Sequence, residues 1–208
     1  MKVNYSYVYL AFFLLLNIFN FVDRNLLIAF APQIKSEFNL TNVQWGLLTG
    51  VYFLFFYSVF GIFMGVLGDK FSRMKIAAAG VFLWSLMTAF TGVAKNFSHL
   101  IVARALIGVG ESALTPNAIS MLSDLFKQNQ RGTASAIYYL GIPLGVGFGM
   151  LIAAFFGPAY GWRSVFITLG LIGMGLGILT YFLLEPRRGQ LDISFDEDNK
   201  STSIRDII

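Results

Sequence analysis

Two charged side chains stand inside an apolar stretch of this sequence. Arg104 and Glu111 lie within the run from Leu100 to Leu125, which is long enough to cross a bilayer. On a helix, one face of this run carries the stripe Arg104, Gly108, Glu111 and Thr115. Because an ionisable group at membrane depth is costly unless it meets a partner or water, we expect the stripe to line a polar interior. A structural ion pair that joins two helices is the alternative interpretation.

A second polar stripe lies in the first apolar run, from Tyr5 to Phe30. Its members span an arc of roughly 120° on a helix whose remaining residues are mostly Phe, Leu, Ile and Val. They are Asn17, Asn20, Asp23 and Arg24. We expect this stripe to face the one in the Leu100–Leu125 run.

The composition is typical of an integral membrane protein. Apolar residues make up 56% of the 208 residues and charged residues only 12%, and the mean hydropathy is +0.68. No basic cluster with interleaved aromatic residues stands outside the apolar runs, which disfavours a nucleic-acid partner. The chain has no cysteine and a single histidine, His99. We therefore expect no metal site, no cofactor and no catalytic residues.

The apolar runs predict an all-α membrane protein with six transmembrane helices. The predicted spans are about 5–30, 45–67, 76–94, 100–122, 133–156 and 162–184. They form one bundle over residues 1–188, and residues 189–208 are predicted to be a cytoplasmic tail. Two sets of glycines have the four-residue spacing of close helix contacts, Gly61 with Gly65, and Gly141, Gly145 and Gly149. Pro143 is expected to bend the fifth span.

The distribution of basic residues predicts the orientation in the membrane. One side of the six spans would carry most of them, namely Lys2, Lys70, Arg73, Lys75, Lys127, Arg131, Arg187, Arg188, Lys200 and Arg205. The other side would carry Lys35, Lys95 and Arg163. Since positively charged loops stay in the cytoplasm, both termini are predicted to be cytoplasmic, in a plasma or inner membrane.

The segment GVLGDKFSRMK between the second and third spans resembles a loop signature of the major facilitator superfamily of transporters. Gly65, Asp69, Lys70 and Arg73 match that signature, whereas Ser72 stands where it has glycine. Further stretches most resemble the Spinster-like branch of the superfamily. These are NFVDRN (20–25), RALIGVGES (104–112), SDLF (123–126), GIPLG (141–145), GWR (161–163) and EPRRG (185–189).

The resemblance implies a secondary transporter. The chain would be the N-terminal six-helix half of the fold, built from two inverted three-helix repeats. A proton-coupling and substrate cavity would be lined by Asp23, Arg24, Arg104 and Glu111, and the polar stripes add Asn20 and Thr115. The arginines would bind an anionic head group and apolar side chains a tail. The implied substrate is an amphiphilic or anionic small molecule, such as a lysolipid or a sphingolipid-like compound.

The resemblance also assigns a cytoplasmic gate to Gly65, Asp69, Lys70 and Arg73. In the superfamily the carboxylate at the Asp69 position pairs with the base at the Arg73 position and with a helix of the opposite half. We expect the same pairing here. A basic turn that only follows the rule for cytoplasmic loops would explain Lys70 and Arg73, but not Gly65 together with Asp69.

Several alternatives stay open on the sequence. A sister branch, the anion:cation symporters, shares the Asp-Arg pair and the GVGE stretch, so the substrate could be an organic anion. A non-transporting six-helix membrane scaffold, or a truncated product, is a further alternative. The chain ends about where a central loop would lead to a seventh helix. Its expected partners are the lipid bilayer and either a C-terminal six-helix half or a second copy of itself.

Overall fold

The computed structural model describes residues 5–189, and all of its regular elements in that range are helices. The elements are α1 (Tyr5–Ala29), α2 (Ala31–Glu37), α3 (Asn42–Gly46), a π-helical turn (Leu47–Val51), α4 (Tyr52–Lys70), α5 (Arg73–Gly92), α6 (Phe97–Ser112), α7 (Leu114–Leu125), α8 (Gln128–Tyr139) and α9 (Gly141–Phe182). The all-α prediction is thus confirmed for the described residues. Beyond Gly189, the predicted tail lies outside them.

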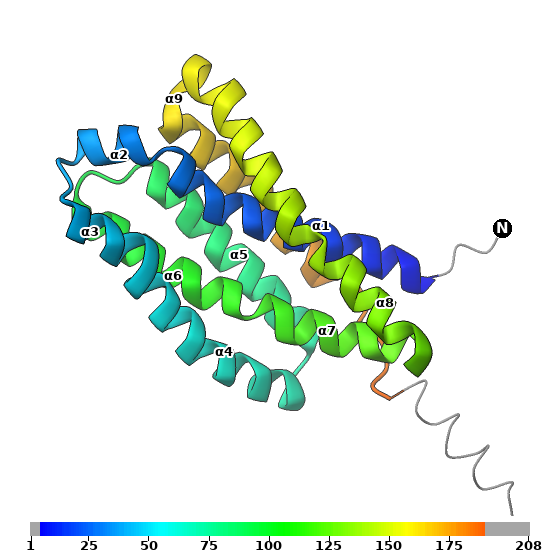
Figure 1. The fold of residues 1–208 in the computed structure, drawn as a ribbon. Helices are drawn as coiled ribbons and strands as arrows, with labels where there is room; N and C mark the ends of the chain where they lie inside the picture. The colour runs from blue at the N-terminus through cyan, green and yellow to red at the C-terminus, as the bar shows by residue number, and fades with distance from the viewer. Residues whose placement is uncertain (1–4, 190–208) are drawn as a thin grey trace, which may run out of the picture.

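Five helical stretches of the described chain are long and apolar enough to cross a bilayer. They are Tyr5–Ala29, Asn42–Lys70, Arg73–Gly92, Phe97–Leu125 and Gln128–Phe182. The last one turns back on itself at Gly161, whose φ of 75° is a backbone conformation that glycine adopts without strain. Figure 1 shows α9 as a hairpin of two arms that meet at this turn. These stretches test neither the number of six spans nor their arrangement in two inverted repeats, so both stay predictions.

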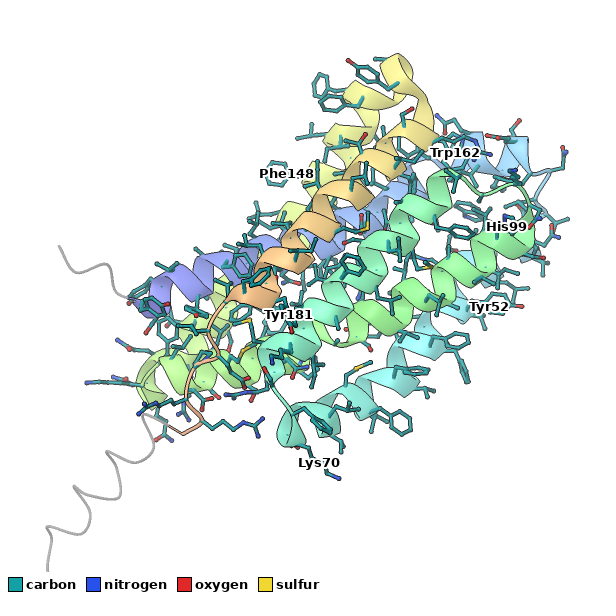
Figure 2. The ribbon with its side chains drawn as sticks, turned by 180° about the vertical axis from the view of Figure 1, so that it is seen from behind. Tyr52, Lys70, His99, Phe148, Trp162 and Tyr181 are labelled. Atoms are coloured by element: carbon teal, nitrogen blue, oxygen red, sulfur yellow. The ribbon has the colours of Figure 1, made fainter. Side chains whose placement is uncertain are left out.

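The helices pack as a row of neighbours. Helix α6 lies between α4 and α5, and α9 packs against both α5 and α1 (Figure 1). In the most apolar part of Phe97–Leu125, 67% of the residues are buried, whereas in that of Asn42–Lys70 only 6% are buried. The stretch that carries Arg104 and Glu111 is therefore central, and α4 is at the edge. Figure 2 shows Lys70 at one end of the bundle and His99 and Trp162 toward the other.

Glycines permit the closest helix contacts, in part as predicted. A Cβ at Gly145 would lie 2.5 Å from the Phe21 Cβ and 2.6 Å from the Ile18 carbonyl oxygen, so the first arm of α9 can touch α1 only through glycine. By contrast, nothing lies within 4 Å of a Cβ built at Gly65. The expected close helix contact at Gly65 is therefore wrong, because its face of the edge helix α4 meets no neighbour.

We expect Gly145→Ala to destabilise the chain by about 1–3 kcal/mol, because the added methyl group would overlap the backbone of α1. Thermal unfolding in detergent would measure the effect. Gly147→Ala is the matched control, since its Cβ would meet nothing within 4 Å. It should be neutral or stabilise by up to about 1 kcal/mol. Equal effects of the two substitutions would show that α9 does not depend on this contact.

Candidate functional site

An ion pair between α1 and α6 is the centre of the candidate site. The Arg24 Nε donates to the Glu111 Oε2 at 2.5 Å. The Glu111 side chain is fully buried, and that of Arg24 is 21% exposed. The two polar stripes predicted from the sequence therefore meet as expected. The second carboxylate oxygen of Glu111 is also buried and has no hydrogen-bond partner among the described residues.

Asp23 lies on the same helix as Arg24 but contacts a different neighbour. Its Oδ2 accepts a hydrogen bond of 3.0 Å from the Thr88 hydroxyl on α5, while its buried Oδ1 has no partner among residues 5–189. Arg104 is also buried, at 6% exposure, and its Nε is likewise unpartnered there. Asp23, Thr88 and Arg104 all line a cavity of about 10 Å³. That volume is close to the least that holds one water molecule, so it is far too small for a substrate.

Aromatic rings of α4 lie under both guanidinium groups. The Arg104 guanidinium carbon is 4.4 Å from the centre of the Phe53 ring. That of Arg24 is 4.8 Å from the same ring and 4.7 Å from the Tyr57 ring. Such cation–π contacts are worth about 0.5–2 kcal/mol, more where water is excluded. These contacts partly compensate the cost of burying the two cations, which together have only one ion-pair partner in the described structure.

The other two predicted cavity residues lie near this group without bonding to it. Asn20 is buried on α1, and its amide nitrogen has no hydrogen-bond partner in the described part of the chain. Thr115 lies on α7, which continues α6 beyond Ala113, and its hydroxyl is 3.1 Å from the Tyr138 hydroxyl. The structure therefore unites Arg24 with Glu111 and places Asp23 and Arg104 at one cavity, whereas the Thr115 hydroxyl bonds to Tyr138.

The expected pairing of Asp69 with Arg73 is wrong. Asp69 and Lys70 are exposed at the end of α4, and the Asp69 carboxylate forms no ion pair within residues 5–189. Arg73 is buried and turns away, toward Asp124 at 2.5 Å and Glu185 at 2.9 Å. The reason is local: the chain is extended at Phe71 and Ser72, and Arg73 begins the next helix, where its side chain meets acidic residues from later in the sequence.

These contacts close the Lys70 end of the bundle. Burial raises the pKa of the Glu185 carboxyl, but hydrogen bonds from Ser72 and Arg73 outweigh that effect and hold the pKa below its usual range. Nearby, the Arg188 guanidinium donates to the carbonyl oxygens that end α4, at Gly68 (2.6 Å), Asp69 and Phe71 (2.7 Å). A cation at a helix C-terminus is favourable because it meets the negative end of the helix dipole.

Arg163 performs a similar role at the Trp162 end. It donates to the Glu37 Oε1 of α2 at 2.6 Å and to the carbonyl oxygens of Gly92 and Ala94 at 2.9 and 2.8 Å. The Trp162 indole donates to the other Glu37 oxygen at 2.9 Å. Hydrogen bonds from Arg163 hold the pKa of Glu37 below its usual range. This cluster therefore joins α2, the end of α5 and the second arm of α9.

Sequence reasoning missed several residues that complete these sites. Thr88 could have been found, because Ser85, Thr88 and Thr91 recur every three residues in an apolar span. Asp124 and Glu185 belong to the motifs SDLF and EPRRG, but nothing in their local sequence identifies Arg73 as their partner. The contacts of the Phe53 and Tyr57 rings could not be predicted, because nothing distinguishes these two rings from the other aromatic residues of the same helix.

Comparison with known proteins identifies a family. The family model described as Major Facilitator Superfamily matches residues 13–206. The chain is 32% identical over 180 residues to the Sphingosine-1-phosphate transporter SPNS2 of Danio rerio, covering 85% of this chain and 36% of that protein. It is 33% identical to Protein spinster of Drosophila melanogaster, covering 83% of this chain and 29% of that protein. It is 29% identical to the Probable L-galactonate transporter of Escherichia coli (strain K12), covering 82% of this chain and 37% of that protein.

A solved structure agrees with these relatives. The bacterial homolog to the human lysosomal transporter Spinster, in its inward-facing and occupied conformation, has a TM-score of 0.80 and 31% sequence identity, covering 93% of this chain and 47% of that one. The present chain thus spans about a third of the length of the curated relatives and about half of the solved structure.

The pH dependence of stability should contain a contribution from Glu37. Because the pKa of Glu37 is lower in the folded chain, its stabilisation is present above the unfolded-state pKa, near 4.5, and is lost as the pH falls through the folded-state value. The melting temperature of wild type should therefore exceed that of Glu37→Gln at pH 6, and the difference should shrink as the pH is lowered below 4.5. A difference that stays constant across this range would contradict the assignment.

Proposed function

This chain belongs to the Major Facilitator Superfamily, in its Spinster-like branch, and we propose that it is one half of a proton-coupled secondary transporter for an anionic amphiphile. The relatives to which it is similar carry the names of transporters rather than enzymes. The observation that carries the proposal is the buried group of Asp23, Arg24, Arg104 and Glu111. Charges at membrane depth are costly, so they mark functional sites by default.

The two carboxylates are the candidates for proton coupling. Asp23 and Glu111 each have one oxygen in a hydrogen bond or ion pair and one buried oxygen without a partner in the described structure. Burial and a neighbouring guanidinium act on the proton affinity of such a group in opposite directions. A conformational change that exposes the group to water, or moves the arginine, would therefore change its proton affinity together with its accessibility.

The two arginines are the candidates for head-group binding. Arg24 remains partly exposed, and Arg104 has no ion-pair partner among the described residues, so an anionic group could satisfy both. The relatives named for sphingosine-1-phosphate support a lipid-like anion, and the resemblance to the probable L-galactonate transporter supports a small organic anion as the second candidate. The exposed apolar side chains of α4, such as Leu54, Phe55 and Phe63, favour the amphiphile, because they offer apolar surface for a tail on the helix whose buried Phe53 ring contacts both arginines.

The substrate cavity requires a second half. Asp23 and Arg104 line a cavity of only about 10 Å³, and none of the four charged residues lines the groove of about 390 Å³ between the two arms of α9. The partner would be a C-terminal six-helix half or a second copy of this chain, docked in the bilayer. In this arrangement the Lys70 end faces the cytoplasm, and the exposed Asp69 carboxylate contacts a helix of the partner half as the gate.

We expect Asp23→Asn and Glu111→Gln to abolish uptake driven by a pH gradient, because each removes a carboxylate that would take the coupling proton. The chain would be reconstituted in proteoliposomes, alone and with a candidate partner half, and tested with a panel of lysolipids and organic anions. Glu37→Gln is the control, since that acid lies outside the spans.

Full uptake by both buried-site variants would contradict proton coupling through this group. A panel in which the wild type moves no compound, with or without the partner half, would favour a membrane scaffold over a transporter. Uptake confined to small organic anions would select the second candidate substrate class.

A further inference from the structure

Two neighbouring spans contain a helix junction of the same kind. Helix α6 meets α7 at Ala113 and α8 meets α9 at Leu140, and both residues keep helical backbone angles, so each span runs on through its junction. A proline follows each junction by three residues, Pro116 and Pro143. Since proline has no N–H group, each leaves the carbonyl four residues earlier without its helical hydrogen bond, which allows the helix to bend.

One residue contacts both junctions. Tyr138 is fully buried at the end of α8, directly before the second junction, and its hydroxyl is 3.1 Å from that of Thr115 in the first turn of α7. Its backbone carbonyl accepts a hydrogen bond of 2.8 Å from the Asn17 amide of α1. A Cβ at Gly141 would lie 2.7–2.9 Å from the Asn17 side chain, so glycine is needed there for α1 to come this close.

The part-buried Thr115 hydroxyl differs from those of Thr91 and Thr180. These two donate only to the carbonyl four residues earlier in their own helix, which is the usual local bond for a threonine inside a helix, whereas the Thr88 hydroxyl also reaches Asp23 on α1. Thr115 instead bonds across to Tyr138, on a different span. The contact between the hydroxyls of Thr115 and Tyr138 therefore links two helices at the points where both can bend.

We propose that Tyr138 is a positioning residue whose hydroxyl makes the fourth and fifth spans bend as one unit. The Asn17 hydrogen bond attaches this unit to α1, two turns before Arg24. A bend of the unit would therefore move the part of α1 that carries Arg24. The inference rests on the proposed transport function, because only a transporter needs the spans to move. The tyrosine ring fills the core, and the hydroxyl couples the two helices.

The test uses the full chain in lipid nanodiscs. Because the sequence has no cysteine, spin labels can be attached at two exposed positions through Lys70→Cys and Lys127→Cys. Double electron–electron resonance would then measure the distribution of distances between the two labels. Tyr138→Phe keeps the ring and should widen the distribution. Thr115→Val should do the same, and the double variant should be no wider than either single variant, because both remove one bond. Thr115→Ser should restore the wild-type distribution.

Thr180→Val is the matched control, since it removes a buried hydroxyl that bonds only within its own helix. It should leave the distribution unchanged. An unchanged distribution in Tyr138→Phe, or additive widening in the double variant, would overturn the coupling. Proteoliposome uptake separates the two proposals: a wild type that transports nothing refutes the transport function, whereas the label distances still decide whether Tyr138 couples the spans.

Discussion

The cost of charge at membrane depth is the constraint on which the rest of this structure depends. Two arginines and two acids lie on α1 and α6, and such groups are stable there only with partners. The Arg24–Glu111 ion pair supplies the direct contact between these helices, the Thr88 hydroxyl holds Asp23, and the ring of Phe53 lies under both guanidinium groups. The two arginines and two acids are thus only partly paired within the described residues.

Ionic clusters at both ends keep the helices in place around this centre. At one end, Arg73 joins the start of α5 to Asp124 and Glu185, and at the other Arg163 joins α9 to Glu37. Both arginines also donate to backbone carbonyls, Arg73 to that of Pro186 beyond α9, and Arg163 to those of Gly92 and Ala94 at the end of α5. Between the two ends, glycines bring α9 against α1 and α5. The Arg73 and Arg163 clusters thus hold the helices together at the two ends of the bundle.

Helical periodicity was sufficient to predict the contact between the two polar stripes, because Arg24 and Glu111 each lie on the polar face of an otherwise apolar run. It also predicted the packing role of Gly145. It could not predict the partners of Arg73, since these depend on where the chain returns after more than fifty residues, and the family pattern suggested Asp69 instead. The apolar pattern also predicted the stretch of α6 and α7 as one span, and it continues through their junction at Ala113.

The most direct test of this account is a double-mutant cycle on the ion pair at its centre. Unfolding in detergent would be measured for wild type, Arg24→Met, Glu111→Gln and the double variant. If the pair joins α1 to α6, each single substitution leaves a buried group unpaired, and the double variant should recover part of the loss, with a coupling of about 1–3 kcal/mol. Additive losses would show that the two residues act independently, and that the charged site does not depend on their contact.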